Sequence, residues 1–132
     1  MTEKTLKIVL IDDDKIALKA VSKLFRPYGV EVICFQDPQE GIDGIAMERP
    51  DLVFLDYLMP NFNGDDVIIK LSEAKLFNDC SLYLLSANDF SDVQVIKFRT
   101  LGFYDVLKKP LSKEVIEAIF VFHFGKVPGI AA

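Results

Sequence analysis

The chain contains no tryptophan, one histidine and only two cysteines among its 132 residues. Cys34 and Cys80 lie far apart, without the Cys-x-x-Cys spacing of zinc and redox sites and without a neighbouring histidine. This pattern disfavours both a cysteine-based metal site and a disulfide framework. We therefore expect both cysteines to be small hydrophobic side chains, buried in or beside strands, in a reducing compartment.

A basic cluster and a long hydrophobic run are also missing. The net charge is −5 and the pI is about 4.8, so the basic face of a nucleic-acid-binding protein is not expected. The longest apolar runs, such as 52–55 and 118–122, are too short to cross a bilayer. The N-terminus is polar and no signal peptide follows it. We expect a cytoplasmic protein that contacts neither membrane nor nucleic acid directly.

What the chain does have is a regular alternation of short apolar runs and amphipathic segments. With 51% hydrophobic residues it can bury the core of one domain. Strands are expected at 6–11, 30–35, 52–55, 81–85 and 103–107, and helices at 15–25, 38–49, 65–75, 92–101 and 113–124. The alternation predicts an α/β fold, a doubly wound five-stranded parallel sheet with five helices on its two faces. The domain is expected to span 1–125, with 126–132 as a tail or linker stub.

The third expected strand ends in an acid. Leu52–Leu55 is continuously apolar, as in strands buried on both faces, and Asp56 follows directly. Pro60 and Gly64 then predict a loop. Open α/β sheets bind ligands at the carboxyl ends of their strands, and a buried carboxylate there needs a cation. Asp56 therefore either faces a cation-binding cleft or only caps the loop.

The other strand ends carry groups that suit such a cleft. Asp12 and Asp13 follow the first strand, Ser86 ends the fourth and Lys109 follows the fifth. All these ends lie on one edge of a parallel sheet. Carboxylates ~4 Å apart repel by about 4 kcal/mol per pair at an effective dielectric near 20, so three of them favour a divalent cation such as Mg²⁺. Asp56 could then accept a phosphoryl group, with the lysine and the hydroxyl stabilising its oxygens.

This set of motifs resembles the receiver domains of two-component response regulators, typified by the chemotaxis regulator. The matching motifs, within about residues 4–125, are Asp12-Asp13, Asp56 with Met59-Pro60 and Gly64, Ser86-Ala87, and Lys109-Pro110. The resemblance implies the flavodoxin-like strand order 2-1-3-4-5. It also implies Mg²⁺ as cofactor, with Asp13, Asp56 and the backbone carbonyl of Leu58 as ligands. Asp12 would act mainly through a metal-bound water, and the bond before Pro110 would be cis.

The same resemblance implies the partners. Asp56 would take its phosphoryl group from a sensor histidine kinase or a histidine phosphotransfer protein. The signal would leave through the face formed by the fourth helix, fifth strand and fifth helix, to an effector protein or domain or to a second copy of the chain. Such a protein is not an enzyme, although it assists its own phosphorylation and dephosphorylation.

Val106 departs from the family pattern, and Leu58 stands at a position that, by the resemblance, affects hydrolysis of the phosphoryl group. An aromatic residue usually stands three positions before the lysine and swings inward on phosphorylation, but here the position holds Val106. Tyr104 is expected on the same strand face as Val106, one layer away. We therefore expect a muted or differently routed output, in which Ser86 still moves. Leu58 cannot orient a water, which predicts a long-lived phosphoryl group.

Other interpretations remain open. A haloacid-dehalogenase-type phosphatase would need an acid at the position of Leu58. A flavodoxin-like cofactor binder would need a phosphate-binding loop after the first strand, where Asp12, Asp13 and Asp14 would repel a phosphate. A degenerate receiver that serves as a protein-interaction module stays open because of Val106. The single histidine, His123, is expected in the last helix, away from the strand ends, without a phosphotransfer role.

Overall fold

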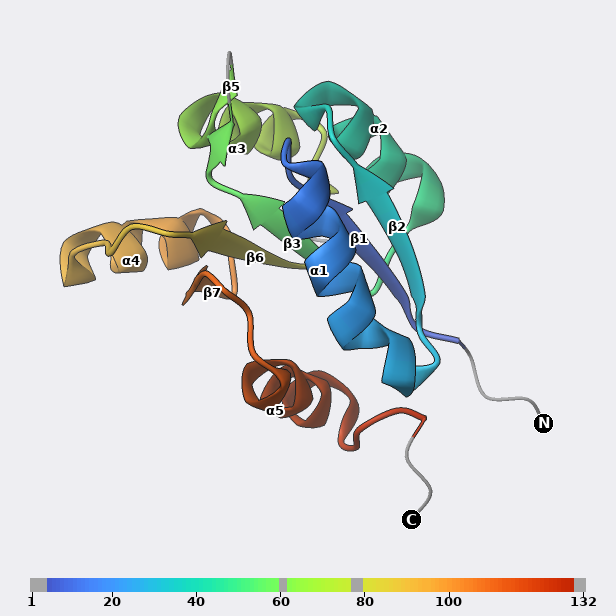
Figure 1. Cartoon of the computed structure of the whole chain (residues 1–132). Helices are drawn as coiled ribbons and strands as arrows, with labels where there is room; N and C mark the ends of the chain where they lie inside the picture. Colours follow the sequence, from blue (N-terminus) through green and yellow to red (C-terminus); the bar gives the residue numbers. More distant parts are fainter. Residues whose placement is uncertain (1–4, 60–61, 77–79, 130–132) are drawn as a thin grey trace.

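The computed structural model describes residues 5–59, 62–76 and 80–129, which form one parallel sheet between two layers of helices (Figure 1). The sheet order is β2-β1-β3-β6-β7, with all neighbours parallel. Its strands are β1 (Lys7–Ile11), β2 (Glu31–Phe35), β3 (Leu52–Asp56), β6 (Ser81–Ser86) and β7 (Asp105–Lys108). The helices are α1 (Lys15–Phe25), α2 (Pro38–Glu48), α3 (Gly64–Glu73), α4 (Asp92–Leu101) and α5 (Lys113–Phe124). The predicted fold and strand order are confirmed.

Helix starts agree with the sequence because the caps are local. The side chains of Asp14, Asp37, Ser91 and Ser112 each accept a hydrogen bond from a backbone N–H in the first turn of the helix that follows. Ser91 and Gln94 form a reciprocal capping box at the start of α4. These caps fix the residues at which α1, α2, α4 and α5 begin.

The core has two halves because alternate strand residues face opposite sides of the sheet. One half packs strand residues such as Val9, Val53 and Leu84 against α2, α3 and α4. The other packs Ile8 and Phe54, among others, against α1 and α5. Figure 1 labels these two helices. Every residue of β3 is buried, as its continuous apolar run predicted.

Three local features differ from the sequence predictions. The loop after Asp56 contains a small antiparallel ribbon, β4 (Leu58–Met59) with β5 (Phe62–Asn63); Pro60 lies outside the described residues. A short 3-10 helix (Arg26–Tyr28) follows α1. The fifth strand of the sheet begins at Asp105 rather than at Phe103.

The expectation of two buried cysteines is wrong. Neither cysteine forms a disulfide; Cys34 is exposed and Cys80 is half-buried. Cys34 lies on β2, which is an edge strand of the sheet because β1 is its only neighbour among the described strands. An edge strand is covered less completely than a central one, and three of the five β2 residues are only half-buried while the other two are exposed.

The division into a domain at 1–125 and a tail at 126–132 stays a prediction, since 130–132 lie outside the described residues. Val127 packs against the α1/α5 half of the core. Gly129 has φ +72° and passes so close to Tyr28 that an added Cβ would lie 2.5 Å from its carbonyl oxygen. In the described ranges, no helix has the length and apolar character needed to cross a membrane.

Candidate phosphoryl-transfer site

Asp56 ends the central strand β3 and is 6% exposed. The strand is flanked by β1 and β6, so the carboxyl ends of three strands surround this carboxylate. The parallel sheet thus brings the carboxyl ends of β1, β3 and β6, which carry the predicted acids and Ser86, to one edge.

The acidic cluster consists of Asp12, Asp13 and Asp56, whose carboxylates each offer an oxygen within 4.8 Å of the others. Asp12 is 6% exposed, whereas Asp13 is exposed and opens the cluster to solvent. The Oδ1 atom of Asp12 accepts from the backbone N–H of Asp14 at 3.0 Å, which orients the side chain. Among the described residues, no other His, Cys, Asp or Glu set converges in this way.

Lys109 places its ammonium between two of these acids. Its Nζ lies 2.7 Å from Oδ2 of Asp12 and 3.2 Å from Oδ1 of Asp56. The backbone N–H of Lys109 donates to the carbonyl of Ser86 at 2.9 Å. The Lys109–Pro110 peptide bond is cis, as the resemblance implied.

Ser86 lies at the end of β6 and is 2% exposed. Its Oγ accepts from the backbone N–H of Asn88 at 3.1 Å, so the oxygen is engaged by the β6–α4 loop. The hydroxyl hydrogen remains available to donate elsewhere.

Burial and the negative charge of Asp12 raise the pKa of Asp56 from 3.8 to about 6. Lys109 and the backbone N–H of Leu58 act in the opposite direction. Burial disfavours the ammonium of Lys109, but the hydrogen bonds and charges of Asp12 and Asp56 outweigh it and raise the pKa of the lysine. Asp56 is therefore a buried carboxylate beside a like charge, and a further cation would stabilise its ionised form.

The donor set fits Mg²⁺. Three carboxylates and one ammonium leave a formal charge of −2, and carboxylate oxygens are the hard ligands that Mg²⁺ prefers. The hydrogen bond from the N–H of Leu58 to Asp56 keeps that backbone beside the site. The contribution of the Leu58 carbonyl stays a prediction.

The strand-face prediction for Tyr104 is wrong. Val106 is half-buried and packs against the α2/α3/α4 half of the core. Tyr104 lies outside β7 and stacks on Tyr83, and its ring lies 4.5 Å from that of His123, on the α5 side. Strict alternation fails because the regular strand starts only at Asp105.

An aromatic triad beside the site was missed. The ring of Tyr57, the residue after Asp56, lies 5.0 Å from Phe90 and 5.4 Å from Phe98, and those two rings are 5.1 Å apart. The triad links the site to the β6–α4 loop and to α4. The sequence signal for this triad is Tyr57, an aromatic residue directly after Asp56, in a chain that has Val106 where the family usually has an aromatic residue.

His123 lies on α5, as predicted, and is half-buried. Its Nε2 lies 2.6 Å from the hydroxyl of Tyr83, and burial lowers its pKa. Its contacts are with the aromatic side chains around it, not with the acidic cluster.

Comparison with known proteins identifies the class. Residues 8–120 match the model of the response regulator receiver domain family. The chain is 29% identical over 109 residues to Protein PilG of Pseudomonas aeruginosa, covering 83% of this chain and 80% of that protein. It is 25% identical over 118 residues to Transcription factor SKN7 of Saccharomyces cerevisiae, covering 89% of this chain. The chain spans only 18% of the length of SKN7.

The fold agrees with solved receiver structures. The receiver domain of Francisella response regulator 1452 superimposes with a TM-score of 0.78 at 24% identity, covering 92% of this chain and 98% of that one. The chain therefore belongs to the response regulator receiver domain family, whose members are signalling phosphoacceptors rather than classical enzymes. This membership does not favour the phosphatase, cofactor-binding or degenerate-receiver interpretations.

Proposed function

We propose that Asp56 accepts a phosphoryl group from the phosphohistidine of a sensor histidine kinase or a histidine phosphotransfer protein. The observation that carries this proposal is the position of the Lys109 ammonium, 3.2 Å from Asp56 and 2.7 Å from Asp12, at the edge of an acidic cluster. A cation fixed beside a buried carboxylate is suited to meet phosphoryl oxygens arriving there.

In the proposed step an Asp56 carboxylate oxygen attacks phosphorus while the bond to the histidine nitrogen breaks and the imidazole leaves. Asp12, Asp13, Asp56 and the Leu58 carbonyl would hold Mg²⁺, with Asp12 acting mainly through water. Bound Mg²⁺ supplies charge neutralisation for the phosphoryl oxygens. Lys109 pairs with one of these oxygens as its contact with Asp56 is replaced.

Ser86 donates its hydroxyl hydrogen to another phosphoryl oxygen. Because its Oγ also accepts from the N–H of Asn88, any movement of the hydroxyl pulls on the start of the β6–α4 loop. These groups assist phosphorylation and dephosphorylation of this chain alone. The exposed, apolar Leu58 has no group to orient a water, which supports a slow loss of the phosphoryl group.

The output surface we propose is the face of α4, β7 and α5. It exposes large apolar side chains that the domain itself leaves uncovered, among them Val93, Ile96 and Phe122. An effector protein, an effector domain or a second copy of the chain would bind there. The setting is the cytoplasm, where kinases transfer phosphoryl groups derived from ATP.

The route to that face runs through the aromatic triad Tyr57–Phe90–Phe98. Val106 is too small to fill the role of a swinging aromatic, whereas the triad already connects the residue after Asp56 to α4. Displacement of the β6–α4 loop by Ser86 would tilt the ring of Phe90 and repack Phe98.

Acetyl phosphate with Mg²⁺ tests the proposal without a cognate kinase. Intact-mass measurement should show one added phosphoryl group on the native protein and none on Asp56→Asn. Absence of any adduct would support a degenerate receiver, and multiple-turnover release of phosphate from a generic ester would support a phosphatase.

A further inference from the structure

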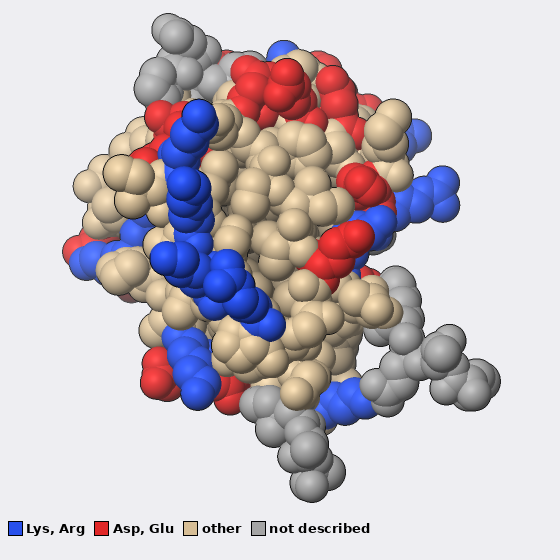
Figure 2. Space-filling model, turned by 45° about the vertical axis from the view of Figure 1, so that its right-hand side comes forward, with Lys and Arg blue, Asp and Glu red and all other residues tan. Residues whose placement is uncertain are grey.

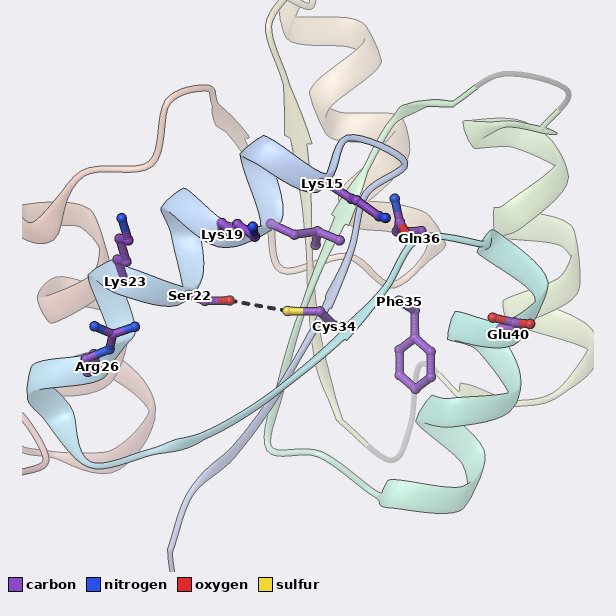
Figure 3. A pocket seen from close by; sticks show the side chains of 10 residues that line it. Lys15, Lys19, Ser22, Lys23, Arg26, Cys34, Phe35, Gln36 and Glu40 are labelled. Atoms are coloured by element: carbon purple, nitrogen blue, oxygen red, sulfur yellow. Dashed lines mark hydrogen bonds between the residues drawn. The ribbon is translucent and has the colours of Figure 1, made fainter.

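A groove of about 710 Å³ lies between α1 and the outer strand β2, apart from the acidic cluster (Figure 3). One wall is α1, and the other is formed by the end of β2 and the start of α2. The phosphoryl-transfer chemistry uses none of its lining residues.

The α1 side of the groove carries four exposed cations, which are Lys15, Lys19 and Lys23 on α1 and Arg26 directly after it. Within the described ranges none of the four forms an ion pair. Figure 2 shows Lys and Arg gathered in a band down this side of the molecule. The cluster is not evident in the sequence because the lysines stand four residues apart, a spacing that brings side chains together only in a helix.

The floor of the groove reaches the edge of the sheet. The Sγ atom of Cys34 lies 3.3 Å from the Oγ atom of Ser22 on α1, and Phe35 points toward α2 (Figure 3). Consecutive side chains of a strand point to opposite faces of the sheet. A groove lined by both Cys34 and Phe35 therefore extends around the edge of β2. No described strand pairs with the outer side of β2, which leaves that edge able to accept another strand.

The spacing of the cations defines the shape of the occupant. Successive lysines on α1 lie about 6 Å apart along the helix axis, at 1.5 Å per residue. Alternate side chains of an extended peptide repeat about every 6.6 Å. Acidic side chains at every second position can therefore meet Lys15, Lys19 and Lys23 in turn, while the side chains between them face the apolar floor.

We propose that this groove binds an extended acidic segment of a partner protein, in which acidic and apolar residues alternate, and that the segment pairs with the β2 edge as an added strand. The chain as a whole has a net charge of −5, so an acidic segment would be attracted to this basic wall and not to the protein surface in general. That overall charge, with Glu40 in the groove itself, disfavours the continuous phosphate backbone of a nucleic acid.

A fluorescent eight-residue peptide of alternating glutamate and valine tests the proposal by anisotropy at low salt. It should bind, and Lys19→Glu/Lys23→Glu should weaken binding by about tenfold, since two surface ion pairs are replaced by repulsion. Lys97→Glu/Lys108→Glu is the control with the same change in net charge away from the groove, and it should leave binding within about twofold. Equal weakening by both double variants, or no binding to the native protein, would overturn the proposal.

Two further arms test the geometry. A peptide with the same composition but with all glutamates in one block should bind more weakly, and so should one with N-methylated amides along one edge, which cannot pair as a strand. Bound peptide should also slow alkylation of Cys34. Equal affinity for these peptides, unchanged alkylation, or tighter binding of single-stranded DNA of similar charge would contradict an extended peptide in this groove.

Discussion

The ammonium nitrogen of Lys109 lies closer to Asp12, at 2.7 Å, than to Asp56, at 3.2 Å. One cation thus faces two carboxylates that are both 6% exposed. Lys109 neutralises only one of the two carboxylates, so one negative charge is left over. This imbalance underlies the predictions about stability, metal binding and reactivity.

Removal of the lysine should destabilise the fold because it leaves two neighbouring buried charges without their cation. Lys109→Met should lower the free energy of unfolding at pH 7.5 by about 1–3 kcal/mol in urea titrations without divalent ions. Adding Asp56→Asn to this variant should restore most of the loss. A double variant no more stable than Lys109→Met would contradict this electrostatic origin.

The pH dependence of stability should follow Asp56. Its pKa is raised to about 6, so its protonation favours the folded state; this contribution is complete below the unfolded pKa near 4 and is lost as the pH rises through 6. Asp56→Asn should therefore be more stable than the native protein at pH 8, by up to about 3 kcal/mol for a shift of two units. The difference should shrink toward pH 4 and on addition of Mg²⁺. A constant difference at every pH would contradict the raised pKa.

Mg²⁺ should stabilise the native protein, by about 2.7 kcal/mol at one hundred times its dissociation constant. Asp13→Asn should reduce the rise in Tm, because Asp13 is expected to be a ligand. Asp14→Asn is the matched control, since asparagine preserves the α1 cap and lies outside the three-carboxylate cluster. Equal Tm shifts in both variants would exclude Asp13 as a ligand.

The aromatic triad should carry the signal to α4. Beryllofluoride, which mimics the bound phosphoryl group, should change amide hydrogen exchange in α4 of the native protein. Tyr57→Leu or Phe90→Leu should reduce this change while binding of the mimic persists. Phe122→Leu, an exposed aromatic outside the triad, is the control. A large response that survives both triad substitutions would show that the signal takes another route.

The phosphoryl lifetime should depend on Leu58. Replacing it by asparagine or glutamate introduces a group able to orient water, so loss of the phosphoryl group should become several-fold faster. The decay of radiolabel from purified phosphoprotein measures the rate. A native half-life as short as that of the variants would contradict the prediction.

The sequence was sufficient for features set by short-range rules. Asp14 and Ser112 cap helices that begin at the predicted residues, 15 and 113, and Asp56 meets Lys109 because parallel strands bring their carboxyl ends to one edge. To predict this convergence it is enough to know that the strands are parallel, and no particular contact between residues has to be known.

The features that were missed depend on neighbours distant in sequence. Whether Cys34 is buried depends on β2 lying at the edge of the sheet, which its own apolar run does not reveal. The face occupied by Tyr104 depends on where pairing with β6 becomes regular. The triad of Tyr57, Phe90 and Phe98 joins three separate segments, and its packing is set by the tertiary fold.

The most direct test of the central claim is to locate the phosphoryl group chemically. After reaction with acetyl phosphate and Mg²⁺, borohydride reduces an aspartyl phosphate to homoserine, and peptide mass mapping finds the converted position. Conversion at Asp56 alone, abolished without Mg²⁺ and greatly reduced in Lys109→Met, is the predicted result. Conversion at Asp12 or Asp13 instead, or none at all, would contradict the assignment of Asp56 as the phosphoacceptor.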